Sequence, residues 1–187
     1  MLQASFSMEY ALLGFFRHQP RHGYELYQQF SDPAGLWQVW RLKQSQFYAL
    51  LAKLEAAGYL SATLQSQDAR PPRKILQLTP AGQAVFLAWV SSPVAHARQI
   101  RMEFLAKLYF AQREGADVAQ QLIAEQQAMC RSWLAEKQIE AQSMDMQAGF
   151  PGYVAQFRLS QLESILAWLA TCEQMAVLES AVFQDRF

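Results

Sequence analysis

Several common functional signatures are missing from this 187-residue chain, and each absence narrows what the protein does. Its two cysteines, Cys130 and Cys172, stand far apart and form no CxxC pair, so we interpret them as buried thiols, with a redox switch as the alternative. The three histidines make no metal-ligand spacing, and we expect neither a metal site nor a cofactor. The motifs GxSxG and GxGxxG and the phosphate-binding P-loop are also absent, so we do not expect an enzyme.

Targeting segments are lacking as well. No run approaches the roughly 20 apolar residues of a membrane-spanning helix. The opening MLQASFSMEY has no basic stretch followed by an apolar one, so no signal peptide is predicted. We therefore expect a cytoplasmic protein without a membrane partner. Hydrophobic residues, in contrast, make up 52% of the chain, which excludes disorder and is enough for a well-packed core.

The charge is balanced overall but unevenly distributed. Residues 1–90 contain eight Lys and Arg against five Asp and Glu, a net charge of +3, whereas residues 91–187 contain eight against eleven, a net charge of −3. Only the first half therefore has the sign expected of a region that meets phosphate.

The first half shows the element order of a winged helix-turn-helix. Helical spacing of apolar residues predicts three helices, from Met8 to about His18, from His22 to Phe30 and from about Lys43 to Ala57. Two strands follow at Tyr59–Leu64 and Lys74–Leu78, and Thr79-Pro80 begins a further helix through Val90. Modules with this order place one helix in the DNA major groove.

The third predicted helix has an unusual outer face. One side carries Phe47, Leu50, Leu51 and Leu54, and the opposite side carries Ser45, Ala49, Ala52 and Ala56. A solvated helix usually exposes Glu and Lys there, whereas small residues let another surface approach closely. Polar neighbours such as Gln46, Tyr48 and Lys53 could then reach base edges or phosphates. The alternative is a helix packed on both sides by protein.

The connection between the two strands is basic. It contains Arg70, Pro71, Pro72 and Arg73, and Lys74 follows at the start of the second strand. We predict a stiff loop whose cations contact phosphate or the minor groove, with an ordinary solvated turn as the alternative.

From Ser92 onward the chain is predicted to form a second, all-helical domain. Its three long helices are separated near Gly115 and at residues 148–152, and the last runs from about Ala155 to Phe183. So few helices with so many apolar positions are expected to pack against a second copy of the chain. The residues that we assign to dimerisation are Phe104, Leu108, Leu162, Leu166 and Leu169.

Three tryptophans and a methionine around this second half have two interpretations. Trp89, Trp133, Trp168 and Met129 are either core residues or the lining of a pocket for a flat aromatic ligand, because such pockets are mostly apolar. The sequence pattern leaves both interpretations open.

Several motifs in one order resemble the PadR family of bacterial transcriptional regulators. They are Tyr10–Gly14 (YALLG), Pro20–Leu26 (PRHGYEL), Gln46–Glu55 (QFYALLAKLE), Gly58–Leu60 (GYL), Arg70–Lys74 (RPPRK) and Leu78–Gly82 (LTPAG). Arg101–Phe110 (RMEFLAKLYF) resembles members with a long helical C-terminal region, the virulence-activator-like type. The resemblance implies a winged helix and a helical homodimer that represses genes until an effector, such as a phenolic acid or a hydrophobic drug, binds. It also matches Tyr24 and Tyr48 to tyrosines of the family motifs.

We thus predict a mainly α fold with an α+β wing, comprising a winged helix-turn-helix DNA-binding domain over residues 1–91 and a helical dimerisation and possible effector-binding domain over 92–187. Operator DNA, a second copy and a small aromatic effector are the predicted partners. The alternatives are a winged-helix protein-interaction module and a protein that sequesters an aromatic ligand, neither of which binds DNA. The residues predicted to contact DNA are Arg21, His22, Tyr24, Lys43, Gln44, Ser45, Gln46, Tyr48, Ala49, Lys53, Arg70, Arg73 and Lys74.

Overall fold

A computed structural model of the protein describes residues 8–67, 70–143 and 149–184, and the side chains of 8–65, 73–142 and 149–176. The chain forms two compact units. The first contains Met1–Ser91 together with Arg101–Phe110, and the second contains Ser92–Ile100 together with Ala111–Phe187. The chain therefore leaves the first unit after Ser91 and returns to it for one short segment.

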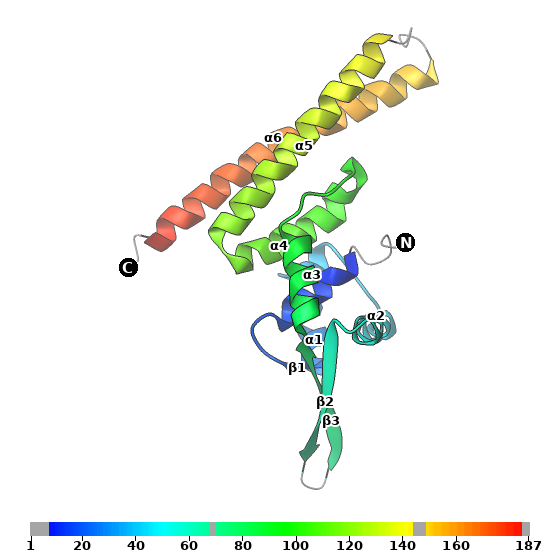
Figure 1. The fold of residues 1–187 in the computed structure, drawn as a ribbon. Helices are drawn as coiled ribbons and strands as arrows, with labels where there is room; N and C mark the ends of the chain where they lie inside the picture. Colours follow the sequence, from blue (N-terminus) through cyan, green and yellow to red (C-terminus); the bar gives the residue numbers. More distant parts are fainter. Residues whose placement is uncertain (1–7, 68–69, 144–148, 185–187) are drawn as a thin grey trace. The chain divides into compact units, whose positions relative to one another are not determined.

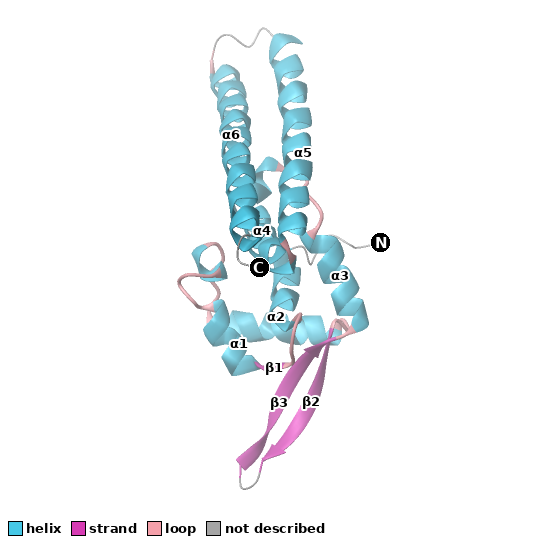
Figure 2. Ribbon diagram, turned by 90° about the vertical axis from the view of Figure 1, so that its left-hand side faces the viewer, coloured by secondary structure: helices cyan, strands magenta, loops and turns pink. Residues whose placement is uncertain are grey.

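The first unit has the predicted order of helices and strands (Figures 1 and 2). It contains the 3-10 helix η1 (Met8–Phe16), strand β1 (Arg21–His22), helix α1 (Gly23–Phe30), the 3-10 turn η2 (Leu36–Gln38), helix α2 (Gln44–Ala56), strands β2 (Leu60–Gln67) and β3 (Arg70–Leu78), and helix α3 (Pro80–Val90). The boundaries of α1 and α2 lie within a residue of those predicted, because both helices carry clear apolar periodicity. The first helix is wound as a 3-10 helix, and five of its apolar residues, Ala11, Leu12, Leu13, Phe15 and Phe16, are buried.

The sheet is antiparallel, with strand order β1-β3-β2. Strands β2 and β3 are longer than predicted and extend as a hairpin (Figure 2). Their register runs from Leu60 opposite Leu78 to Gln65 opposite Arg73, and shifts before Gln67 pairs with Arg70. The prediction of a loop over residues 70–73 was therefore wrong. β1 pairs only with Ile75 and Leu76 of β3. The preceding residues 70–74 of β3 therefore lie at an edge of the sheet, where prolines are tolerated although they lack an N–H.

Short capping interactions join α2, the hairpin and α3. Gly58 has a φ of 78° and follows α2 as the predicted left-handed residue. Thr79 begins α3 as predicted, since its Oγ1 accepts a hydrogen bond from the Gly82 N–H at 3.0 Å. The same hydroxyl donates to the Gly58 carbonyl at 2.7 Å. Any side chain at residue 82 would collide with the Tyr59 carbonyl, so only glycine fits there.

Aromatic side chains form the core of the first unit. The rings of Phe30 and Phe47 lie 5.0 Å apart, which joins α1 to α2. Phe15 meets Phe110 edge-on at 5.2 Å, so the returning segment 101–110 completes this core. Gly14 allows that approach, because a Cβ atom there would lie 2.5 Å from the Phe110 ring.

The returning segment consists of the π-helix η4 (Ile100–Phe104) and the first part of helix α4 (Leu105–Glu114), and it carries a buried lysine. Lys107 donates to the Trp89 carbonyl at 2.8 Å and lies 3.8 Å from Glu103. Burial lowers the pKa of Lys107 to about 8, although the Glu103 carboxylate opposes the shift. Trp89 itself is buried and its indole donates to Glu103 at 3.3 Å, so this tryptophan is a core residue.

The second unit is built on helices α5 (Ala116–Ser143) and α6 (Phe150–Gln184), which lie side by side in both views (Figures 1 and 2). α6 begins earlier than predicted, since Pro151 is acceptable in a first helical turn. The Gln126 side chain accepts from the Val94 N–H at 2.7 Å and donates to the Val94 carbonyl at 3.4 Å, which fastens residues 92–100 to α5. Burial raises the pKa of the Cys130 thiol, which disfavours the reactive thiolate.

None of the helices in the described residues combines the length and the apolar character needed to cross a membrane.

Candidate nucleic-acid interface

The outer face of α2 is bare within the first unit. Phe47, Leu51 and Leu54 are buried, whereas Ser45, Ala49, Ala52 and Ala56 are all exposed. The interpretation in which protein packs on both sides of this helix does not hold within the first unit. The exposed side is narrow and uncharged, so a second surface can approach the helix backbone closely.

The start of α2 is stabilised by Gln46, which the sequence analysis assigned to contact with DNA. The Lys43 side chain does not cap the helix, but the Lys43 N–H donates a hydrogen bond to Gln46 Oε1 at 3.0 Å. Gln46 thereby satisfies a backbone group at the helix terminus. Lys43, Gln44 and Ser45 are exposed at the same end.

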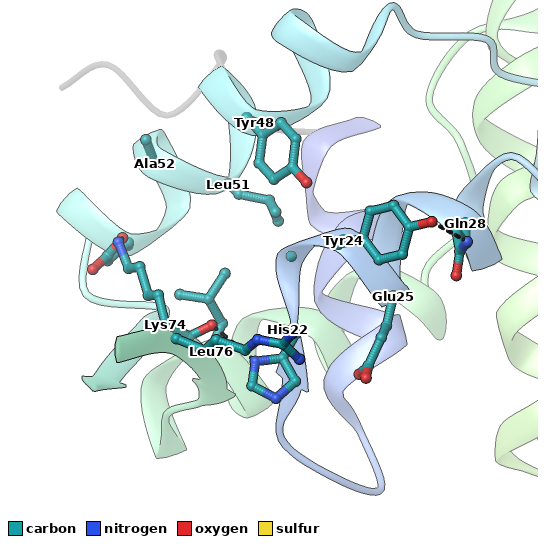
Figure 3. Close-up of a pocket in the computed structure, with 12 residues that line it drawn as sticks. His22, Tyr24, Glu25, Gln28, Tyr48, Leu51, Ala52, Lys74 and Leu76 are labelled. Carbon is teal, nitrogen blue, oxygen red and sulfur yellow. Dashed lines mark hydrogen bonds and ion pairs between the residues drawn. The ribbon is translucent and has the colours of Figure 1, made fainter. Parts of the chain in front are cut away.

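Tyr48 and the glycine of the HGY motif fit against one another. A Cβ atom on Gly23 would lie 2.8 Å from the Tyr48 ring, so glycine at this position is what allows the ring to lie over α1. Figure 3 shows Tyr48 pointing from α2 towards Tyr24 of α1. Tyr24 is 61% exposed, and its hydroxyl accepts a hydrogen bond from Gln28 Nε2 at 2.6 Å.

A concavity of about 730 Å³ lies between α1, α2 and β3. Five residues of the predicted DNA-contacting set line it: Arg73, and His22, Tyr24, Tyr48 and Lys74, which are labelled in Figure 3. The lining does not include seven other residues of the set, which are Arg21, Lys43, Gln44, Ser45, Gln46, Ala49 and Lys53. The side chain of Arg70 lies outside the described residues, and only its backbone pairing with Gln67 is defined.

Two lysines that were predicted to contact DNA already form ion pairs in the first unit. Lys74 Nζ lies 2.6 Å from Glu55 Oε2, and Lys53 Nζ lies 2.9 Å from Glu9 Oε2. These ion pairs tie β3 and η1 to α2. They also place carboxylates beside two of the lysines proposed to meet phosphate.

Arg21 and His22 contact the backbone instead. Arg21 Nε donates to the Phe15 carbonyl at 3.1 Å, and His22 Nδ1 lies 3.3 Å from the Lys74 carbonyl. Both side chains are half-buried, so each offers only part of its surface to an external phosphate. Arg73, in contrast, is exposed.

The sequence interpretation missed three polar residues of the concavity. Gln28 and Glu25 come from the outer side of α1, and Glu55 comes from the end of α2. The spacing of Tyr24 and Gln28, four residues apart on one helix, is a signal that could have identified Gln28. Glu55 could not be identified in that way, because its partner is 19 residues away on β3.

The residues assigned to dimerisation are largely internal. Phe104, Leu162 and Leu169 are buried within the single chain, whereas Leu108 and Leu166 are half-buried. No three His, Cys, Asp or Glu side chains gather as potential metal ligands in the part of the chain that the structure describes.

The three helical segments, the antiparallel hairpin and the exposed α2 define a winged helix-turn-helix followed by a helical region. Residues 12–88 match the sequence profile of the "Transcriptional regulator PadR-like family". This segment is therefore similar to the PadR-like family of transcriptional regulators, as its motifs had indicated. The matched family consists of transcriptional regulators rather than enzymes.

One curated relative is "Negative transcriptional regulator PadR" of Bacillus subtilis (strain 168), which is 27% identical over 125 residues, or 65% of this chain and 68% of the relative. Among solved structures, "Crystal structure of Bacillus subtilis PadR in complex with operator DNA" is 24% identical and covers 90% of this chain and 98% of its own, with a TM-score of 0.44. The corresponding structure "in complex with p-coumaric acid" is 23% identical and covers 91% and 98%, with a TM-score of 0.40.

Proposed function

We propose that this protein is a sequence-specific DNA-binding regulator that reads its operator with α2. The observation that carries the proposal is the exposed, uncharged face Ser45–Ala49–Ala52–Ala56 beside a concavity that also holds Arg73 and Lys74. A major groove admits a helix whose outer side chains are small, and flanking cations supply the phosphate contacts.

The contacts divide into base-reading and phosphate-holding residues. Ser45, Gln46, Tyr48 and Ala49 would face the major groove, together with Gln44 at the start of the helix and Tyr24 at its edge. For Gln46 this requires exchanging its hydrogen bond with the Lys43 N–H for one with a base. Gln46 then makes as many hydrogen bonds as before, and the N–H of the exposed Lys43 can donate to water instead, so the cost is small.

The remaining residues of the set are cationic and would hold the DNA backbone. Arg70, Arg73 and Lys74 lie on β3, and Arg21, His22, Lys43 and Lys53 lie near the ends or sides of the helices. Because phosphate contacts carry no sequence information, this group is expected to set affinity and register.

We assign dimerisation to the second unit. A homodimer with two-fold symmetry would present two copies of α2 to operator half-sites about 34 Å apart, or a multiple of that distance. Leu162 and Leu169 would support such an interface from the interior of the second unit, whereas Phe104 is buried in the first. The exposed side chains of α6, led by Phe150, Tyr153 and Phe157, would supply the contact area.

Repression, relieved by a small aromatic effector, is the mode of action that we propose. The relative from Bacillus subtilis is named a negative transcriptional regulator, and repression is the common mode in the family that the motifs resemble. A protein of this kind would act in the cytoplasm, where the bacterial chromosome lies.

Fluorescence anisotropy with the promoter fragment beside its own gene tests the proposal. The variant Arg73→Ala/Lys74→Ala should weaken binding to all sequences and lower the slope of log affinity against log salt by about 0.9 for each phosphate that is no longer neutralised. Arg101→Ala is the matched control, because Arg101 is exposed and lies outside the concavity. An unchanged slope in the double variant would contradict the assignment of β3, and the absence of binding to any promoter fragment would contradict DNA recognition itself.

A further inference from the structure

Two exposed polar side chains of α1 form a pair in the concavity between α1, α2 and β3. Gln28 Nε2 donates a hydrogen bond to the hydroxyl oxygen of Tyr24 at 2.6 Å, and both residues line the concavity (Figure 3). We propose that Gln28 is a positioning residue, which directs the Tyr24 hydroxyl as a hydrogen-bond donor to a phosphate oxygen of DNA. The inference rests on the proposed function and deepens it, because it adds a contact with the same duplex.

The geometry of α1 brings this pair together. Side chains four residues apart lie one above the other on a helix and lean towards its N-terminal end, so Gln28 reaches back to Tyr24. Leu26 and Phe30 of the same helix are buried, whereas Tyr24 and Gln28 are exposed. The pair therefore stands on the outer side of a helix whose inner side is fixed in the core.

The position of Tyr24 is next to the face of α2 that we assign to DNA. Tyr48 points from α2 towards Tyr24 in Figure 3, and the lack of a side chain at Gly23 lets the Tyr48 ring lie over α1. In a helix-turn-helix, the helix before the recognition helix crosses the DNA backbone. A duplex that receives α2 in its major groove would thus bring phosphates to α1.

The hydrogen bond from Gln28 decides where the Tyr24 proton can point. An amide N–H only donates, so the Tyr24 oxygen accepts this bond and its own proton must point elsewhere. A phenol proton lies near the plane of its ring and has two positions there, one of which is blocked by the Gln28 amide. A hydroxyl that already accepts one hydrogen bond is also a stronger donor. A phosphate oxygen, which can only accept, is a matching partner.

A neutral donor matters here because the charges that line the concavity are balanced. With His22 neutral, the lining contains two cations, Arg73 and Lys74, and two carboxylates, Glu25 and Glu55. Glu55 is paired with Lys74 at 2.6 Å, and Figure 3 shows Glu25 pointing away from the hydroxyl of the pair on α1. A phosphate that approaches α1 therefore gains little from net charge, and an O–H donor supplies a directed hydrogen bond instead.

Fluorescence anisotropy with variants of the full chain tests the positioning role. Tyr24→Phe removes only the hydroxyl and should weaken DNA binding about tenfold, the size expected for a hydrogen bond to a charged group. Gln28→Met keeps a side chain of similar length but frees the hydroxyl to rotate, and should weaken binding about threefold. In a chain that already carries Tyr24→Phe, Gln28→Met should have no further effect, because Gln28 acts through that hydroxyl. An equal effect of Gln28→Met in both backgrounds would overturn the proposal.

The salt dependence separates this contact from general damage to the interface. A neutral donor releases no counterions, so Tyr24→Phe and Gln28→Met should leave the slope of log affinity against log salt unchanged. Gln83→Met, at an exposed glutamine of α3 outside the lining, is the matched control and should change neither affinity nor slope. A slope that falls in Gln28→Met would mean that the cations of the interface have moved, and would refute the positioning role.

Two duplexes distinguish a phosphate from a base as the acceptor. Both substitutions should weaken binding to the promoter fragment and to a scrambled duplex of equal length by the same factor, because phosphate contacts carry no sequence information. A loss confined to the promoter fragment would place the hydroxyl on a base and refute the phosphate assignment.

The same measurements separate this proposal from the proposed function. Unchanged binding by Tyr24→Phe and Gln28→Met, together with weaker binding by Arg73→Ala/Lys74→Ala, would refute the proposal and leave the proposed function standing. An original protein that binds neither duplex would refute both.

Discussion

Helices α2 and α6 both expose uncharged side chains, but those of α2 are small and those of α6 are large and aromatic. On α2 the exposed residues are Ser45, Ala49, Ala52 and Ala56. On α6 they include Phe150, Tyr153 and Phe157, which are 78%, 77% and 64% exposed. The spacing of three and four residues places these three aromatic side chains on one face of the helix.

The difference indicates two kinds of partner. Burial of apolar surface stabilises an interface by roughly 25 cal/mol per Å², so a row of alanines offers little to a protein partner, whereas three exposed aromatic residues offer much. A DNA duplex instead requires small side chains that permit close approach, with cations at the sides. Helix α2 has both features. The molecule therefore presents one surface suited to nucleic acid and another suited to a second protein chain.

The largest effect is expected from a bulky anion on the face of α2. Ala49→Glu or Ala52→Glu should weaken DNA binding about 100-fold or more, because the side chain blocks the groove and repels phosphate. Both positions are exposed, so the melting temperature should change little. Ala84→Glu, at an exposed alanine of α3, is the control. Anisotropy measurements in which Ala49→Glu binds as well as the original protein would show that this face does not meet DNA.

A smaller effect is expected on the aromatic face of α6. Tyr153→Asp/Phe157→Asp should raise the dissociation constant of the dimer about tenfold or more, since two charges would have to be buried in the interface. Sedimentation velocity at several concentrations measures the shift from dimer to monomer. Gln156→Asp adds a charge at an exposed position of the same helix and tests whether charge alone is responsible. A dimer that resists the double substitution would move the interface to another part of the second unit.

The smallest effect is expected at the edge of the α2 face, where Glu55 pairs with Lys74. Glu55→Gln should tighten DNA binding about threefold and steepen the salt dependence by about 0.9, because Lys74 no longer has to exchange a carboxylate for a phosphate. The gain is modest, since an exposed ion pair is worth only about 0–1 kcal/mol. Glu163→Gln, on α6, controls for the change in net charge. Weaker binding by Glu55→Gln would mean that Glu55 instead orients Lys74 towards the DNA.

Local signals predicted much of the first unit. The extents of α1 and α2, the left-handed Gly58 and the Thr79 cap follow from apolar periodicity and from residues whose conformational preferences are strong. The structure places Arg73 and Lys74 in the concavity beside α2, whereas the sequence pattern had predicted Arg73 in a loop and not in β3.

Features that depend on distant residues could not be predicted in this way. The edge position of residues 70–74 depends on how far β1 extends along β3, and that pairing joins residues more than 50 positions apart. The ion pair between Lys53 and Glu9 spans 44 positions. Phe104 has an apolar character suited to an interface, but it is fully buried in the single chain. Periodicity shows that a side is apolar without showing what covers it.

The return of residues 101–110 to the first unit determines where this protein can be cut. A fragment that stops at Ser91 would lack Phe110, whose ring fills the space above Gly14 and meets Phe15 and Phe86. The side chains of Phe15 and Phe86 would then lose a covering ring, and the isolated winged helix would lose part of its packing energy. A shortened protein for titration against short duplexes should therefore extend beyond Phe110 and keep residues 92–100, which connect α3 to the returning segment.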